Sequence, residues 1–342
     1  MKVKDRQIGD GNVYVVAEIG ASHNQNYQKA VALVYAAQKA GADAVKLQTF
    51  RPEDMTLETH TPYQTDFWIR SGEWKGQSLF DLYKKIAMPW EWQPKLKEVA
   101  DNIGIDLFST PFSLEAVDFL EAEVNPPCYK IASPEMCWGE LLDKVDATGK
   151  DVFISTGCAE DFWEISQSIR RISKKRCVPL YCTWGYPSKP KDVGLMTIPA
   201  LSQSCGVYVG ISDHTQGIAI AIAAVAMGAQ VVEKHIKIDE DSPDAAFALY
   251  PKEFENMVKG IRDVEPAIRG CLYDGRHNST WHYRRSLICV QTIRKDEEIT
   301  NDNVKPLRPN AGMYPNKISG ILGKKAKTDI NVGTGIQPEM VE

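Results

Sequence analysis

The sequence has no long apolar run. Its first residues, MKVKDRQIGDGNVYVVAEIG, carry several charges ahead of the first apolar segment, and no later stretch reaches the roughly 20 apolar residues that cross a bilayer. We therefore expect neither a secretory signal peptide nor a membrane span, and we predict a cytoplasmic protein.

The sequence also has no excess of basic residues and no closely spaced pair of cysteines. The net charge of −5 argues against general binding to nucleic acid or to anionic membranes, so an anionic substrate would need a local group of positive side chains. The eight cysteines are scattered without a CxxC pair, which is typical of reduced thiols in a cytosolic protein.

Short apolar segments alternate with helix-like segments eight times between residues 12 and 270. Most are continuous apolar runs, as expected for parallel strands that are buried on both faces. The strand candidates are Val13–Ile19, Ala44–Thr49, Asp106–Ser109, Cys128–Ala132, Asp151–Ser155, Pro179–Thr183, Tyr208–Ser212 and Val231–Ile236. A doubly wound open sheet is the alternative, but AEIGASHNQN is not the glycine-rich segment that usually follows its first strand. We predict a (β/α)₈ TIM barrel over residues 1–270.

Two regions depart from this alternation. Residues 51–104 form an unusually long connection that is rich in aromatic residues, and we interpret its tryptophans as anchors for the loop rather than as a platform for sugar. After a linker at residues 271–285, residues 286–342 contain short strand-like segments and turns. We predict a small β-rich C-terminal domain there.

Polar side chains lie in the C-terminal part of every predicted strand of the barrel or directly after it. They include Glu18, Lys46, Gln48, Thr110, Lys130, Ser133, Ser155, Tyr186, Ser212, His214, Glu233 and His235. Because the chemistry of a (β/α)₈ barrel takes place at the C-terminal ends of its strands, this convergence predicts an active site.

The lysines and hydroxyls of this set are suited to an anionic ligand. Lys46 and Lys130 supply positive charge, and the hydroxyls of Thr110, Ser133, Ser155 and Ser212 are donors that can orient a phosphate and a carboxylate. The alternative for either lysine is a solvated position on the rim of the barrel. Two lysines inside apolar strands make that alternative weaker, because a buried ammonium without a partner is costly.

The remaining polar groups fit metal or acid–base chemistry. His214 and His235 end neighbouring strands, and imidazole suits Zn, Mn or Fe, although either histidine could instead be a hydrogen-bonded core residue or an acid–base group. Glu18 is a candidate for proton exchange with substrate, and the alternative is a salt bridge to Lys46 or Lys234.

Several motifs, in this order, resemble the sialic acid synthase family. They are AEIGASHNQ, GADAVKLQTF, STPFSLEAVDFLE, YKIAS, ISTG, GISDHTQGIAIAIAAVAMGA, VVEKHI and SPDAAF. The segment RRSLICVQTIRKDEEITNDNVKPLRP resembles the family's C-terminal antifreeze-like (SAF) domain. Within the family, SLFDLYKKIAMPWEWQPKL and EAVDFLE look most like pseudaminic acid synthases, ahead of the N-acetylneuraminic and legionaminic acid enzymes.

The resemblance implies a reaction between phosphoenolpyruvate and an N-acetylated amino-sugar aldehyde in a domain-swapped homodimer. It implies that His214 and His235 bind Mn²⁺ or Mg²⁺ and act in catalysis with Glu18. Phosphoenolpyruvate would be bound by Lys46, Thr110, Lys130, Ser133, Ser155 and Ser212. The sugar would be bound by Glu18, Gln48, Tyr186 and Asp244, and by Arg308, which would reach the partner subunit's active site.

Three positions depart from the family's pattern. Trp184 replaces a small polar residue, SPDAAFAL replaces the usual GPD with a following Ser, and LRPNAG lacks the usual Gly after Pro. These departures affect the sugar side of the site and leave the lysines and histidines in place. Two other interpretations stay open. One is another enzyme on the same barrel, either an aldolase that uses a lysine such as Lys130 to form a Schiff base or a related phosphoenolpyruvate-using synthase that acts on a phosphorylated sugar. The other is a non-catalytic sugar-binding barrel.

Overall fold

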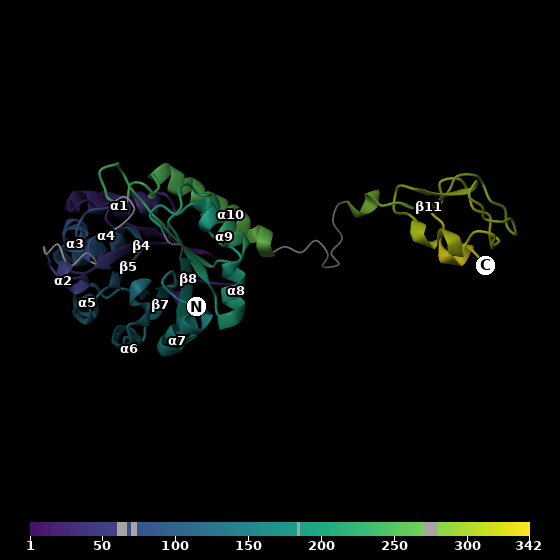
Figure 1. The fold of residues 1–342 in the computed structure, drawn as a ribbon. Helices are drawn as coiled ribbons and strands as arrows, with labels where there is room; N and C mark the ends of the chain where they lie inside the picture. The colour runs from purple at the N-terminus through teal and green to yellow at the C-terminus, as the bar shows by residue number, and fades with distance from the viewer. Residues whose placement is uncertain (60–66, 70–73, 183–184, 270–279) are drawn as a thin grey trace. The chain divides into compact units, whose positions relative to one another are not determined.

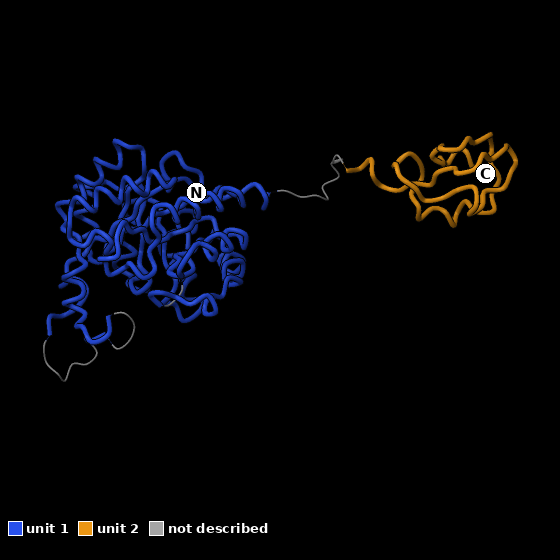
Figure 2. The backbone as a smooth tube through the Cα atoms, turned by 90° about the horizontal axis from the view of Figure 1, so that it is seen from above, with its two compact units in different colours: residues 1–270 blue, residues 271–342 orange. Residues whose placement is uncertain are grey.

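The structure is a computed structural model that describes residues 1–59, 67–69, 74–182, 185–269 and 280–342. The chain forms two compact units, Met1–Gly270 and Cys271–Glu342, which are coloured separately in Figure 2. Each unit has its own apolar core. Within the described residues, no helix combines the length and the apolar character needed to cross a membrane.

The first unit is a closed barrel of eight parallel strands inside a ring of helices (Figure 1). Its strands are β3 (Tyr14–Glu18), β4 (Ala44–Thr49), β5 (Asp106–Pro111), β6 (Cys128–Ile131), β7 (Asp151–Ser155), β8 (Cys177–Cys182), β9 (Gly210–Asp213) and β10 (Val231–His235). Each strand pairs with its neighbours in the sequence, and β10 closes the barrel on β3. The predicted (β/α)₈ fold is confirmed.

The helices pack on the outside of the barrel through apolar faces. In α1 the buried residues Ala30, Leu33, Val34 and Ala37 recur at helical spacing, and Asn26 caps the first turn by accepting a hydrogen bond from the amide of Lys29 at 3.1 Å. The helices are α1 (Tyr27–Lys39), α2 (Pro52–Met55), α3 (Leu79–Ile86), α4 (Gln93–Ile103), α5 (Leu114–Phe119), α6 (Gly139–Ala147), α7 (Phe162–Ile172), α8 (Thr197–Cys205), α9 (Ala219–Ala226) and α10 (Pro251–Arg269).

The long connection after β4 carries α2, α3 and α4. Trp90 fixes its return to the barrel, because the indole Nε1 donates to the Phe50 carbonyl at 3.2 Å and the ring lies 4.9 Å from that of Phe119. Gln25, in the loop after β3, donates to the carbonyls of Lys84 and Ala87 at the end of α3, at 2.7 and 3.2 Å. The connection is therefore attached to the side of the barrel where the strands end.

A short N-terminal hairpin, β1 (Lys2–Val3) and β2 (Arg6–Gln7), was not predicted. Val3 and Ile8 pack in an apolar cluster with Tyr14, at the beginning of β3. Arg6 donates to Asp43 at 2.9 Å, just ahead of β4. These contacts cover the end of the barrel opposite to the predicted site.

The second unit is small and β-rich. It pairs β11 (Ser286–Cys289) with β12 (Val304–Leu307) in antiparallel register around its own apolar cluster. Arg308 follows β12 directly and is exposed.

Candidate active site

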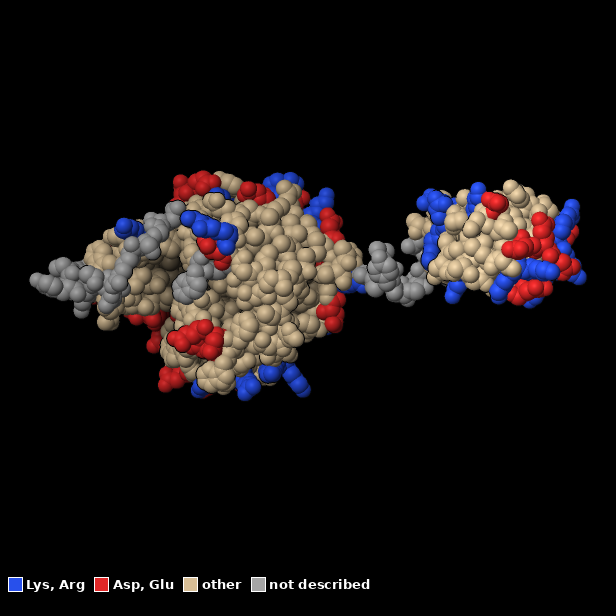
Figure 3. Space-filling view, turned by 45° about the vertical axis from the view of Figure 1, so that its right-hand side comes forward, with Lys and Arg blue, Asp and Glu red and all other residues tan. Residues whose placement is uncertain are grey.

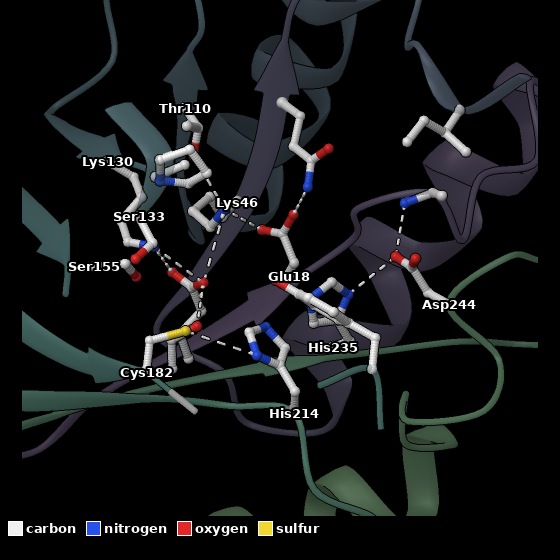
Figure 4. A pocket seen from close by; sticks show the side chains of 18 of the residues that line it. Glu18, Lys46, Thr110, Lys130, Ser133, Ser155, Cys182, His214, His235 and Asp244 are labelled. Atoms are coloured by element: carbon white, nitrogen blue, oxygen red, sulfur yellow. Dashed lines mark hydrogen bonds and ion pairs between the residues drawn. The ribbon is translucent and has the colours of Figure 1, made fainter. Parts of the chain in front are cut away.

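A cavity of about 230 Å³ lies at the C-terminal ends of the barrel strands. Every predicted site residue of the first unit lines it: Glu18, Lys46, Gln48, Thr110, Lys130, Ser133, Ser155, Tyr186, Ser212, His214, His235 and Asp244. Arg308 belongs to the second unit, and its role stays a prediction. In Figure 4 the lysines and serines lie on one side, His235 and Asp244 on the other, and Glu18 between them.

Strand register explains why these residues meet. Glu18 of β3 is opposite Lys46 of β4 on one side and opposite His235 of β10 on the other. Side chains alternate along each strand, so Glu233 and His235 of β10 both face the cavity while Lys234 between them points outward. Lys234 pairs there with Asp213 of β9, with Nζ 2.9 Å from Oδ2, and both side chains are fully buried.

The two lysines lie within the barrel and not on its rim. Lys46 and Lys130 are 4% and 3% exposed, which rules out the solvated alternative. Lys46 Nζ lies 2.7 Å from Glu18 Oε2 and donates to Thr110 Oγ1 at 3.1 Å. Lys130 Nζ lies 3.3 Å from both carboxylate oxygens of Glu233, which also accepts from Ser212 Oγ at 3.0 Å.

These pairs set the charges on the floor of the site. Burial disfavours the Glu233 carboxylate, but Lys130 and Lys46 outweigh burial and lower its pKa to about 2. Burial also acts against the Lys46 ammonium, and Glu18 and Glu233 together still raise its pKa. The pKa of Lys130 is lowered, because burial outweighs the attraction of Glu233.

Some hydrogen-bonding capacity on this side is unused within the protein. Ser155 Oγ is buried and has no hydrogen-bond partner among the described residues. Ser133 Oγ accepts from the amide of Cys158 at 2.6 Å, which leaves its own proton for a ligand. A ligand with several acceptor oxygens, such as a phosphate, would complete both groups.

The opposite side of the cavity holds the two histidines. The rings of His214 and His235 lie 5.3 Å apart between centroids, and both side chains are buried. His235 Nδ1 is 3.0 Å from Asp244 Oδ2, so the carboxylate fixes the ring and leaves Nε2 for a ligand. His214 Nδ1 is 3.8 Å from Cys182 Sγ.

Two imidazoles with a carboxylate behind one of them fit a divalent cation that keeps open positions for water and substrate. Among the described residues, no group of three or more His, Cys, Asp or Glu side chains could by itself enclose a metal ion. His214 and His235 would be the protein's ligands to such an ion.

Asp244 holds the histidine side together. Its Oδ2 also accepts from the amide of Ala21 at 2.8 Å, so it connects the loops after β3 and β10. Gly20 makes room for this contact, because a Cβ there would lie 2.3 Å from Asp244 Oδ2 and 3.0 Å from the His235 ring. Its φ of 48° also favours glycine.

Aromatic rings surround the histidines. Measured between ring centroids, Tyr186 lies 4.4 Å from His214 and 5.3 Å from Phe247. Phe247 lies 4.8 Å from His235. Trp74 also lines the cavity, and its ring centroid lies 6.1 Å from that of Tyr186, so this tryptophan of the long connection contacts the site as well. Trp184, one of the three departures from the family's pattern, lies outside the described residues.

The sequence model of the NeuB family matches residues 33–271, and the SAF domain model matches residues 284–342. The chain belongs to the NeuB family. The predicted membership, the SAF domain and the synthase-type transferase class are confirmed with it.

Relatives of this NeuB-family chain match it over nearly its full length. It is 35% identical over 341 residues to a pseudaminic acid synthase of Campylobacter jejuni, covering 97% of this chain and 98% of that protein. It is 31% identical to an N,N'-diacetyllegionaminic acid synthase of Legionella pneumophila, covering 96% and 94%. A solved N-acetylneuraminic acid synthetase of Leptospira borgpetersenii superposes with a TM-score of 0.71 at 27% identity, covering 82% and 93%.

One residue of the NeuB-family site had no role in our sequence analysis. Glu233 contacts Lys46, Lys130 and Ser212, and so connects three of the predicted phosphoenolpyruvate ligands. The available signal was its place two residues before His235 in an apolar strand, which puts both on the same face.

Proposed function

We propose that this protein condenses phosphoenolpyruvate with an N-acetylated amino-sugar aldehyde. The products would be a nine-carbon 2-keto-3-deoxy sugar of the sialic acid type, most simply pseudaminic acid, and phosphate. The observation that carries the proposal is the two-sided cavity, with paired lysines and hydroxyls opposite two histidines. The choice of pseudaminic acid as the product is supported by a relative of this chain that is named pseudaminic acid synthase.

Phosphoenolpyruvate would occupy the lysine side. Lys46 and Lys130 balance the phosphate and carboxylate charges, and the hydroxyls of Thr110, Ser133, Ser155 and Ser212 orient their oxygens. The chain as a whole does not supply this positive charge, since its net charge is −5 and the barrel face seen in Figure 3 carries acidic as well as basic side chains. The attraction is therefore local to the cavity.

The sugar would occupy the histidine side, held by Gln48, Tyr186 and Asp244, with Arg308 of the partner subunit in a domain-swapped homodimer. A divalent ion on His214 and His235, Mn²⁺ or Mg²⁺, would supply Lewis-acid polarisation of the open-chain aldehyde. Asp244 keeps His235 oriented through Nδ1. Catalysis would then be carried by the barrel of residues 1–270, and the SAF domain of residues 286–342 would complete the site.

In the reaction, C3 of phosphoenolpyruvate forms a bond to the aldehyde carbon, and positive charge develops at C2. Water adds at C2, and phosphate leaves by cleavage of the C2–O bond, which generates the keto group. The buried carboxylates of Glu18 and Glu233 lie near this charge, and the lysines hold the departing phosphate.

Glu18 is the candidate for proton transfer near the aldehyde oxygen. Gln48 Nε2 donates to Glu18 Oε1 at 2.9 Å, and Lys46 Nζ lies 2.7 Å from Oε2, so the carboxyl is held in one position. Burial raises its pKa although Lys46 opposes this. A raised pKa favours a group that must both take up and release a proton.

The test is phosphate release from phosphoenolpyruvate, with Mn²⁺ or with EDTA, against three acceptors. These are N-acetylmannosamine, 2,4-diacetamido-2,4,6-trideoxymannose, and the corresponding altrose that leads to pseudaminic acid. Metal-dependent release with the altrose alone supports the proposal, and release with another acceptor assigns the N-acetylneuraminic or legionaminic branch. Release with none, while phosphoenolpyruvate still binds, would favour the non-catalytic barrel.

A further inference from the structure

The loop that follows β10 is closed at its base on His235 itself. Leu249 donates its amide to the His235 carbonyl at 2.9 Å, and Lys237 donates its amide to the Leu249 carbonyl at 2.9 Å. The enclosed residues, 237–249, include Asp244 and Phe247, which both contact the His235 ring. The conformation of this loop therefore determines how the histidine side of the site is built.

A buried lysine lies under the loop. Lys237 is 7% exposed, and its Nζ donates to the Ala245 carbonyl at 2.7 Å and to Glu240 Oε1 at 2.8 Å. The ammonium also lies 4.7 Å from the centre of the Tyr250 ring. One charged group thus joins the start, the middle and the end of the loop.

We propose that Lys237 is a positioning residue that sets Asp244 and Phe247 against His235 through the Ala245 carbonyl. The inference rests on the proposed function for its catalytic consequence. Ala245 is the neighbour of Asp244 in the chain, so a shift of its carbonyl moves the carboxylate that orients the histidine.

Other contacts also hold the loop, including the bond from the Ala21 amide to Asp244 Oδ2, but none of them replaces the donor at the Ala245 carbonyl. Lys29 pairs with Asp239 at 2.6 Å near the loop's beginning, and Gln216 donates to the Ala246 carbonyl at 3.1 Å at an exposed position. The Lys237 bond is buried, and a buried carbonyl that loses its donor has no solvent to replace it. Without Lys237, the turn over residues 244–247 would have to rearrange.

The phosphoenolpyruvate side gives an internal reference for the test. Lys46, Lys130 and Ser155 belong to β4, β6 and β7, and the two lysines make their hydrogen bonds and ion pairs to Glu18, Thr110 and Glu233, which lie outside residues 237–249. A change confined to the loop should therefore weaken the binding of sugar and metal and leave the binding of phosphoenolpyruvate unchanged.

The test compares Lys237→Met with Lys252→Met in the full chain. Methionine keeps most of the apolar stem and removes the donors, and Lys252 is an exposed lysine that pairs with Glu255 at 2.8 Å. A second variant, Glu240→Gln, removes the ion pair with Lys237 but leaves the bond to the Ala245 carbonyl.

For Lys237→Met we expect weaker Mn²⁺ binding, by about tenfold in calorimetry, as for loss of a group that orients a metal ligand. We expect KM for the sugar to rise and kcat to fall, each about tenfold, while KM for phosphoenolpyruvate changes less than about twofold. Amide hydrogen exchange should accelerate in residues 239–249. Lys252→Met and Glu240→Gln should each stay within about twofold of the parent protein.

Unchanged Mn²⁺ affinity and unchanged exchange in Lys237→Met would overturn the inference. So would equal increases in both KM values, because a general loss of folding does not distinguish the two halves of the site. If no acceptor sugar supports phosphate release, the proposed function fails, and Mn²⁺ binding and hydrogen exchange still decide the role of Lys237.

Discussion

Both carboxylate oxygens of Glu233 lie 3.3 Å from the ammonium of Lys130 on the floor of the cavity. Oε1 is also 3.8 Å from Lys46 Nζ. Glu233 therefore compensates the buried ammonium of Lys130 and shares with Glu18 the compensation of Lys46. This arrangement makes Glu233 a support for phosphoenolpyruvate binding although it repels the ligand's charge.

Glu233→Gln should destabilise the fold and weaken phosphoenolpyruvate binding together. Removing one partner of a buried pair costs about 3 kcal/mol, and we expect KM for phosphoenolpyruvate to rise at least about tenfold. Urea unfolding and steady-state kinetics measure the two effects. Glu115→Gln is the control, because Glu115 pairs with Arg51 at 2.9 Å on the surface and its loss should cost under about 1 kcal/mol. Equal stability of the two variants would contradict the proposed compensation.

His235→Ala should abolish turnover and weaken Mn²⁺ binding, because one of two protein ligands is lost. Asp244→Asn should have a smaller effect, about 10- to 100-fold in Mn²⁺ affinity, because it disturbs the orientation of the ring and leaves the ligand. Calorimetric titration with Mn²⁺ ranks the two variants. Full activity in His235→Ala would exclude the two-histidine site.

Gly20→Ala should be far more harmful than an ordinary glycine replacement. Its Cβ would lie 2.3 Å from Asp244 Oδ2, so the loop after β3 must move away from His235. Gly104→Ala is a matched control, since Gly104 has φ of 73° and no atom within 4 Å of the added carbon. We expect a stability loss of about 1 kcal/mol from backbone strain at Gly104, and at least twice that with loss of activity at Gly20. Thermal unfolding and phosphate release test both variants.

His23 should make stability depend on pH on the acid side. Burial lowers its pKa to about 4, against about 6.5 in an unfolded chain. Above pH 6.5 the contribution is complete, and as the pH falls toward 4 the unfolded state takes up the proton first, so stability declines by about 3 kcal/mol. His23 Nδ1 accepts from the amide of Gln25 at 2.9 Å, and His23→Asn keeps an acceptor while removing the titrating ring. The slope of unfolding free energy between pH 6.5 and 4 should be smaller in the variant, and an equal slope would assign it to other groups.

Arg308→Ala tests the shared active site. If Arg308 acts in the partner subunit, the variant should lose activity, and so should His235→Ala. A 1:1 mixture of the two variants with random subunit exchange should regain about a quarter of the parent activity, because about half of the dimers are then mixed and one of the two sites in each holds both intact residues. A fully active monomer in light scattering, or no recovery on mixing, would show that Arg308 does not act across subunits.

The sequence predicted the barrel because continuous apolar strands and their polar ends follow simple periodicities. Strand register then brought Glu18, Lys46 and His235 together, since Glu18 of β3 is paired with Lys46 of β4 and with His235 of β10. The hairpin of residues 2–7 escaped prediction because two-residue strands carry no periodicity. That Trp74 also lines the cavity was not predicted, because a loop's path over a cavity depends on contacts far apart in the sequence, such as its approach to Tyr186. The role of Glu233 required knowing that Lys46 and Lys130 point at the same place.

The outward-facing ion pair of Lys234 and Asp213 limits how these two positions can change during evolution. It joins the two strands that carry the histidines, and both side chains are fully buried. Replacing either partner alone leaves an uncompensated charge at a cost of about 3–5 kcal/mol, a large part of the about 5–15 kcal/mol that stabilises a typical domain. A lineage can therefore exchange this pair only through two nearly simultaneous substitutions. We expect the two residues to be inherited as a unit while exposed pairs around the barrel drift.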